Sequence, residues 1–160
     1  MPAPNASAPP WSDSSDAAAL ARAIVFFESL SPANLRQIDQ VYAPQARFKD
    51  PFNEVQGPTA ISAIFAHMFS VLEGPRFVVH DRLIKNGQAF VTWDFVFAYR
   101  RGAPAGLQTV RGASHLQFDA QGRITMHRDY WDAAEELYEK LPLLGLLMRW
   151  LRRRLATPEI

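Results

Sequence analysis

The second half of the chain has the pattern of an antiparallel β-sheet. Between residues 76 and 131, four segments rich in β-branched and aromatic residues follow one another, and each turn between them contains glycine. The first turn, Asn86-Gly87, is the dipeptide most typical of a two-residue hairpin. The sequence therefore predicts a meander of four strands with the approximate spans 76–85, 88–100, 107–119 and 123–131.

The first half of the chain has the pattern of helices. Apolar residues recur at helical spacing in three segments, 17–30, 33–43 and 59–72. Ser15 or Asp16 is suited to cap the first helix, and Pro44 is expected to end the second. One short strand, 46–52, precedes the third helix. Because helices and strands occupy separate parts of the chain, we expect an α+β fold in which helices cover the concave face of a curved antiparallel sheet.

The two ends of the chain differ from the rest in composition. Residues 1–15 are rich in proline, alanine and serine and lack the apolar core of a secretory signal, so we expect a disordered lead-in. Residues 16–140 are long enough for one domain with its own core. Residues 141–160 predict a basic amphipathic helix. Two interpretations of it stay open: contact with an anionic membrane surface, or a cover over a pocket or a partner subunit.

Composition excludes several kinds of site. The chain has no cysteine, which rules out disulfides, thiolate metal sites and cysteine nucleophiles. Its net charge is +1, so we expect no nucleic-acid partner. The sequence contains neither an HxxxH motif nor a glycine-rich phosphate loop, and we therefore expect no metal and no other cofactor. The expected compartment is the cytoplasm.

Strand alternation divides the candidate polar residues between two faces. In segment 46–52, Asp50 shares a face with the apolar Phe48, which favours an inward position. In the last strand, His127 and Asp129 share a face with Trp131, but both faces are mixed and periodicity alone leaves the choice open. In the strand before it, alternation puts His115 outward, with Arg111 and Gln117, and Ser114 inward.

The order of these elements resembles the NTF2-like superfamily. The motif KDPF at 49–52 and the sequence FDAQGRITMHRDYWD at 118–132 bring the chain near the ketosteroid-isomerase-like and SnoaL-like polyketide cyclase branches of that superfamily. The resemblance covers roughly residues 17–136. It implies a cone-shaped α+β barrel, a deep apolar pocket and a homodimer that forms through the outer face of the sheet, but not one reaction, because the fold hosts many functions.

The resemblance also suggests roles for single residues. Asp50 matches the general base of the isomerases, whereas their two oxyanion donors fall on Phe26 and Ser114. Steroid isomerisation by that mechanism is therefore not expected, because the oxyanion hole would lack its donors. In the cyclases and the related limonene-epoxide hydrolases, an aspartate on the last strand is the acid/base, and Asp129 matches it best. His115 is a possible counterpart of a second cyclase residue, a histidine.

These observations predict a cofactor-free acid/base enzyme, of isomerase, cyclase or epoxide-hydrolase type, that acts on a small apolar substrate. The expected catalytic residues are Asp50, Asp129 and His127. The expected substrate-binding residues are Phe26, Phe48, Trp93, Phe95, Ser114 and Trp131. Each catalytic candidate has a purely structural alternative: a cap for the turn at Pro51, an ion pair with an arginine, and an interface histidine, respectively. At the level of the whole chain, the alternative is a non-catalytic binding module for an apolar or lipid-like ligand.

Overall fold

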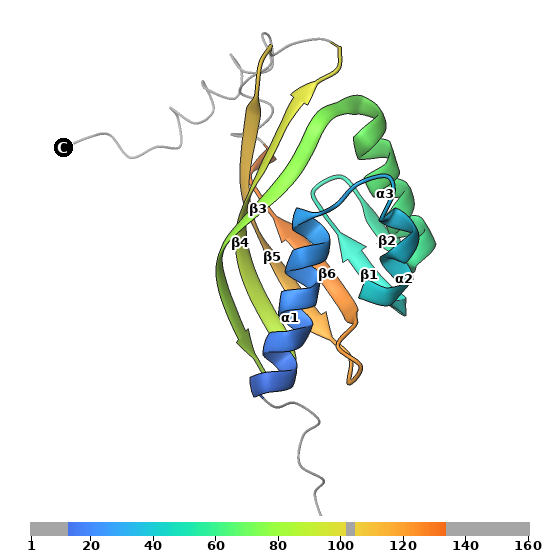
Figure 1. Cartoon of the computed structure of the whole chain (residues 1–160), viewed down its shortest axis with the longest axis vertical. Helices are drawn as coiled ribbons and strands as arrows, with labels where there is room; N and C mark the ends of the chain where they lie inside the picture. Colours follow the sequence, from blue (N-terminus) through green and yellow to red (C-terminus); the bar gives the residue numbers. More distant parts are fainter. Residues whose placement is uncertain (1–12, 102–104, 134–160) are drawn as a thin grey trace, which may run out of the picture.

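A curved, unclosed sheet of six strands forms the body of the molecule, and helices pack against its inner face (Figure 1). This computed structural model describes residues 13–101 and 105–133. The strand order is β2-β1-β6-β5-β4-β3. The strands are β1 Tyr42–Lys49, β2 Glu54–Gln56, β3 Leu72–Lys85, β4 Gln88–Tyr99, β5 Gln108–Phe118 and β6 Ile124–Tyr130. The helices are α1 Asp13–Glu28, the 3₁₀ turn η1 Leu35–Gln37, α2 Ile38–Val41 and α3 Pro58–Val71.

The predicted meander is confirmed, with β3 to β6 pairing antiparallel in chain order. At its first turn Asn86 and Gly87 have φ values of 52° and 70°, as a type I′ hairpin requires. The Oδ2 atom of Asp16 accepts a 2.9 Å hydrogen bond from the backbone N–H of Gly87. Asp16 is therefore not the cap of the first helix, which begins earlier, at Asp13; it anchors α1 to the hairpin.

The sheet is not wholly antiparallel, which corrects the expectation from sequence. Strand β1 lies between β2 and β6, and it runs parallel to β6 with Phe48 opposite His127 and Lys49 opposite Arg128. The short strand β2, which the sequence did not predict, pairs antiparallel with β1. The parallel pair joins segments about eighty residues apart, and no turn signal marks so distant a contact.

The second helix ends earlier than expected. Its predicted stripe included Tyr42, but the structure has only η1 and α2, and Tyr42 already has extended dihedrals of φ −104° and ψ 137°. The physical reason is Pro44, which disfavours helical geometry in the residue before it and offers no N–H to a helix. Tyr42 therefore opens strand β1, where its side chain is completely buried.

The core lies between the inner face of the sheet and the helices. From α1 it takes Leu20, Ile24 and Phe27; from the sheet it takes Val91, Leu116 and Ile124, all buried. Within the described residues, none of the helices has the length and apolar character needed to cross a membrane. Two predictions fall on residues outside the described ones: the lead-in, of which residues 1–12 are not described, and the basic amphipathic helix of residues 141–160.

Candidate active site

A buried row of hydrogen bonds joins the first and last long strands of the sheet. The phenol oxygen of Tyr42, in β1, lies 2.6 Å from Nδ1 of His127, in β6. The other ring nitrogen of His127, Nε2, lies 2.8 Å from Oδ1 of Asp129. The side chains of His127 and Asp129 are only 5% and 14% exposed. The last strand therefore turns His127 and Asp129 inward, as the resemblance implied and periodicity left open.

A second branch reaches the same carboxylate oxygen from β4 and β5. The hydroxyl of Ser114 lies 2.5 Å from Oδ1 of Asp129, and the indole Nε1 of Trp93 donates to Ser114 Oγ over 2.8 Å. Trp93 pairs in register with Gly112, and a Cβ atom at Gly112 would come within 2.3 Å of the indole ring. The lack of a side chain at Gly112 therefore gives Trp93 its place on the inner face.

The donors in these two branches decide where the protons lie. An indole N–H only donates, so Ser114 Oγ accepts from Trp93 and gives its own proton to Asp129. Burial, and secondarily the charge of Asp129, raise the pKa of Tyr42 well above its usual value, so the phenol stays protonated and donates to His127 Nδ1. His127 consequently carries its proton on Nε2 and donates it to Asp129. Oδ1 of Asp129 thus accepts two hydrogen bonds.

The second oxygen of Asp129 is placed differently. Oδ2 accepts no hydrogen bond from any side chain or backbone group in the described part of the chain, although Asp129 lines an apolar cavity of about 280 Å³. Aromatic and aliphatic side chains form most of the cavity wall. Four of the predicted substrate-binding residues lie in this wall: Phe48, Trp93, Phe95 and Trp131.

The other two predicted substrate-binding residues lie elsewhere. Ser114 lines a much smaller pocket, together with His127 and Asp129, that shares Asp129 and Trp93 with the cavity. Phe26 is buried in the core against Phe27 and is not among the residues that line the cavity. Phe27 is the member of this pair that meets the site, because its ring lies 5.2 Å from the imidazole of His127.

Asp50 lies at the cavity wall, and its carboxylate closes a turn. Its Oδ1 accepts hydrogen bonds from the backbone N–H groups of Phe52 and Asn53, at 2.7 and 2.6 Å. The side-chain amide of Asn53 reaches both oxygens, at 3.1 and 3.0 Å. Lys49, the last residue of β1, pairs with Arg128 of β6 in the parallel ladder. Asp50 and Asp129 are the next residues of the two segments and therefore lie at the same level. Both carboxylates line the same cavity.

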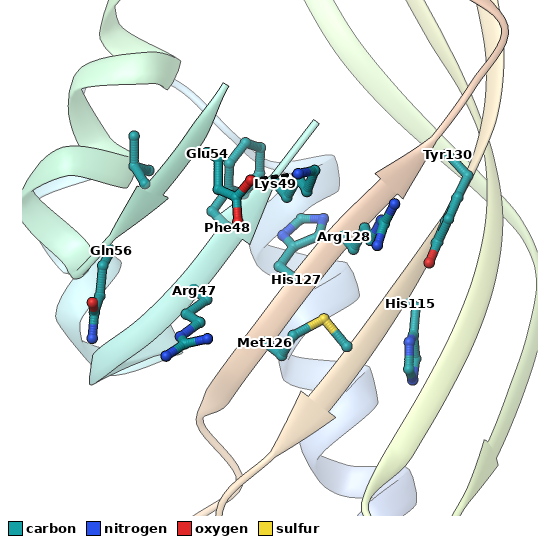
Figure 2. Close-up of a pocket in the computed structure, with 11 residues that line it drawn as sticks. Arg47, Phe48, Lys49, Glu54, Gln56, His115, Met126, His127, Arg128 and Tyr130 are labelled. Atoms are coloured by element: carbon teal, nitrogen blue, oxygen red, sulfur yellow. Dashed lines mark hydrogen bonds and ion pairs between the residues drawn. The ribbon is translucent and has the colours of Figure 1, made fainter. Parts of the chain in front are cut away.

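The outer face of the same strands carries cations instead. Arg47, Lys49 and Arg128 line an open groove of about 550 Å³, and Figure 2 shows them on its walls. Lys49 forms an ion pair with Glu54 of β2. His115 lines this groove too, so its side chain points outward as alternation predicts; its ring stacks on that of Phe90 at 4.3 Å.

Tyr42 is the first of two residues of this site that sequence reasoning missed. It was assigned to a helix, and its hydroxyl was therefore not compared with the polar groups of the last strand. The usable signal was Pro44, which disfavours helical geometry at Ala43 and therefore indicates that a helix ends near Tyr42. Phe27 was missed because the resemblance to the isomerases placed their oxyanion-donor position on the neighbouring residue, Phe26.

Residues 24–127 match the family model of the SnoaL-like domain. No curated protein matches the chain significantly. Among solved structures, a protein from Catenulispora acidiphila DSM 44928 with a ketosteroid isomerase-like fold, in complex with trimethylamine, is 17% identical. The match covers 75% of this chain and 93% of that one, with a TM-score of 0.65.

Two further solved structures have the same architecture. An NTF2-like protein of unknown function from Burkholderia pseudomallei K96243 is 15% identical over 76% of this chain and 93% of that one, with a TM-score of 0.64. An LEH-like epoxide hydrolase from M. tuberculosis is 17% identical over 84% of this chain and 96% of that one, with a TM-score of 0.63. At these identities the likeness concerns the fold alone, and it confirms the NTF2-like α+β architecture expected from the sequence.

Proposed function

The chain belongs to the family of SnoaL-like domains, and on that premise we propose that it is a cofactor-free acid/base enzyme with Asp129 as the proton-transferring group. The substrate is a small, mainly apolar molecule held in the 280 Å³ cavity. The reaction belongs to the isomerase, cyclase or epoxide-opening type. These reactions share one requirement, a carboxyl group that takes or gives a proton in an apolar pocket.

The observation that carries this proposal is the unequal placement of the two oxygens of Asp129. Oδ1 accepts hydrogen bonds from Ser114 and His127, which fix the orientation of the carboxylate. Oδ2 has no donor from residues 13–101 and 105–133, although Asp129 lines the cavity. A general base must lie within hydrogen-bond reach of the proton it abstracts, and in this proposal Oδ2, which has no donor in the described residues, takes that role for a ligand in the cavity.

His127 and Tyr42 act in this proposal as positioning residues. When Oδ2 takes a proton from the substrate, the Nε2–H of His127 keeps its hydrogen bond to Oδ1, so the carboxyl group does not rotate. Tyr42 holds the imidazole in the tautomer that can donate to Asp129, because its own proton goes to Nδ1. Trp93 orients Ser114 in the same way from the other side.

Asp50 has a secondary role in the proposal. Its Oδ1 accepts two backbone hydrogen bonds, and both of its oxygens contact the Asn53 amide, so proton transfer by Asp50 would compete with the turn it closes. It adds a second negative charge to the cavity wall, next to the position that Asp129 occupies on the neighbouring strand. Asp50 is therefore expected to affect substrate binding more than the rate of proton transfer.

A panel of small substrates tests the proposal. Enolisable ketones in D₂O report α-proton exchange, and epoxides report diol formation, both followed by NMR with the full-length protein. We expect turnover of at least one class by the wild type and its loss in Asp129→Asn. Asp94→Asn is the matched control, because Asp94 lies on the outer face, where it contacts His80. Full turnover by Asp129→Asn would contradict the proposal, and ligand binding without any turnover would favour the binding module.

A further inference from the structure

Strand alternation separates the charges of the site by sign. Two pairs of consecutive residues lie side by side: Lys49-Asp50, at the end of β1, and Arg128-Asp129, in the parallel strand β6. In both pairs the cation lines the groove on the outer face, as Figure 2 shows, whereas the carboxylate lines the inner cavity. All four residues also border an open pocket at the ends of the two strands. Neither Lys49 nor Arg128 lines the inner cavity, whereas Asp50 and Asp129 both do.

The described wall of the cavity contains no lysine or arginine. Its only basic side chain within residues 13–101 and 105–133 is that of His67, on the exposed side of α3. Asp50 and Asp129 are the acidic members. Since His127 in its neutral form donates to Asp129 as a dipole, the hydrogen bonds to this carboxylate do not neutralise its charge.

Aromatic rings supply the rest of the electrostatic character of the cavity. Phe77 and Phe95 stack with their centroids 4.6 Å apart, and Trp93 meets Phe77 edge-on at 5.6 Å. Phe97 and Tyr99 extend the same wall. The faces of aromatic rings carry partial negative charge and attract cations, including quaternary ammonium groups. Rings and carboxylates therefore favour the same sign of ligand charge.

We propose that the cavity selects an apolar cation, such as an alkylated amine or ammonium compound, over neutral and anionic molecules of the same shape. The alkyl groups contact the aromatic wall, and the positive centre lies towards Asp129, whose Oδ2 has no donor from the described chain. This inference names the ligand class for the site of the proposed function and rests on that function only for the use of the same cavity.

Three compounds of nearly equal shape and different charge test the inference. Choline is the cation, 3,3-dimethylbutan-1-ol replaces its nitrogen by carbon, and 3,3-dimethylbutanoate is the anion. Binding is measured by NMR titration of the full chain at pH 8, where an ordinary histidine is neutral. We expect the Kd of choline to be at least about tenfold lower than that of the alcohol, in line with cation–π attraction in a desolvated site. The butanoate should bind weakest.

Two variants locate the effect. Asp129→Asn should reduce the preference for choline and keep the binding of the alcohol, which also shows that the variant is folded. Asp94→Asn, which removes a carboxylate from the outer face, should keep the full preference. Equal binding of choline and the alcohol to the wild type would overturn the inference, and so would an unchanged preference in Asp129→Asn.

The binding series is independent of turnover. Turnover of a neutral substrate without any preference for choline would refute the cationic ligand and leave Asp129 as the acid/base. A clear preference for choline in a protein that turns over no substrate would support the ligand class and count against the enzyme.

Discussion

The phenol oxygen of Tyr42 lies 2.6 Å from Nδ1 of His127, and the side chains of both residues are buried. Their rings are nearly parallel, with an angle of 12° between the planes. This contact joins β1 to β6 across the parallel ladder, and it also fixes which nitrogen of the imidazole faces Asp129. Fold and candidate active site therefore share one hydrogen bond.

Replacement of Tyr42 by phenylalanine should destabilise the protein. The substitution keeps the ring but leaves Nδ1 of a buried imidazole without a donor, which costs roughly 1–3 kcal/mol of unfolding free energy. Urea denaturation measures the loss. Tyr130→Phe is the control, because Tyr130 is exposed and an exposed substitution should change the free energy by less than about 0.5 kcal/mol. If the two variants had the same free energy of unfolding, the hydrogen bond of Tyr42 would not contribute to the stability of the fold.

The same residue should make stability fall at high pH. Burial, with a smaller effect of the Asp129 charge, raises the pKa of Tyr42 well above its usual value, while the unfolded chain keeps a tyrosine pKa of about 10. The folded state therefore retains a proton that the unfolded state releases, so this contribution is intact below pH ~10 and is lost as the pH rises further. Unfolding free energies at pH 8 and pH 11 should differ less in Tyr42→Phe than in the wild type. An identical pH dependence in both proteins would show that Tyr42 ionises equally in both states.

Gly112→Ala should disturb the orientation of Trp93. The new Cβ would lie 2.3 Å from the indole, a contact that forces either the ring or the strand to move. Overpacking of this kind costs roughly 1–3 kcal/mol. A double-mutant cycle with Trp93→Phe isolates the clash, because the smaller ring should make Gly112→Ala less costly than it is in the wild type. If the effects of the two substitutions on the free energy of unfolding were additive, the loss of stability in Gly112→Ala would not come from a clash with Trp93.

His115 should titrate at lower pH than an ordinary histidine. Burial lowers its pKa, and the ring of Phe90 covers one face of the imidazole at 4.3 Å. The folded state thus binds this proton less well than the unfolded state, and the associated stability is lost as the pH falls below about 6.5. NMR titration of the His115 ring protons should show the low midpoint, and Phe90→Ala should move it back towards 6.5. If Phe90→Ala left the titration midpoint of His115 unchanged, residues other than Phe90 would cause the burial that lowers its pKa.

Local signals in the sequence were sufficient for the meander, and together with the family resemblance they predicted the inner face of the last strand. Asn86-Gly87 specifies one turn type, and the alternation of His127 and Asp129 needs only the family resemblance to orient it. Asp50 was placed correctly at the cavity wall by the same alternation. The structural alternative to a catalytic role was that Asp50 caps the turn at Pro51. The hydrogen bonds that its carboxylate accepts from the backbone N–H groups of Phe52 and Asn53 show that Asp50 does cap this turn.

Contacts between distant segments were beyond the reach of local patterns. The parallel pairing of β1 with β6 brings together segments that are far apart in the chain. Periodicity could therefore predict neither that Phe48 lies opposite His127 nor that the strand β2 exists. Tyr42 fitted a helical stripe and a strand equally well, since apolar and aromatic residues suit both. Its partner His127 is 85 positions away, and only the folded chain brings the two together.

The most direct test of the account is the ratio of kcat between the wild type and Asp129→Asn, measured at saturation with any substrate that the wild type turns over. Asparagine keeps the shape of the side chain but can neither take nor give a proton, and general acid/base catalysis contributes typically 10²–10⁴-fold to a rate. We expect kcat to fall at least about 100-fold, while Asp50→Asn, which still accepts the turn hydrogen bonds, loses less than about tenfold. A kcat for Asp129→Asn within about twofold of the wild type would contradict the assignment of Asp129 as the proton-transferring group.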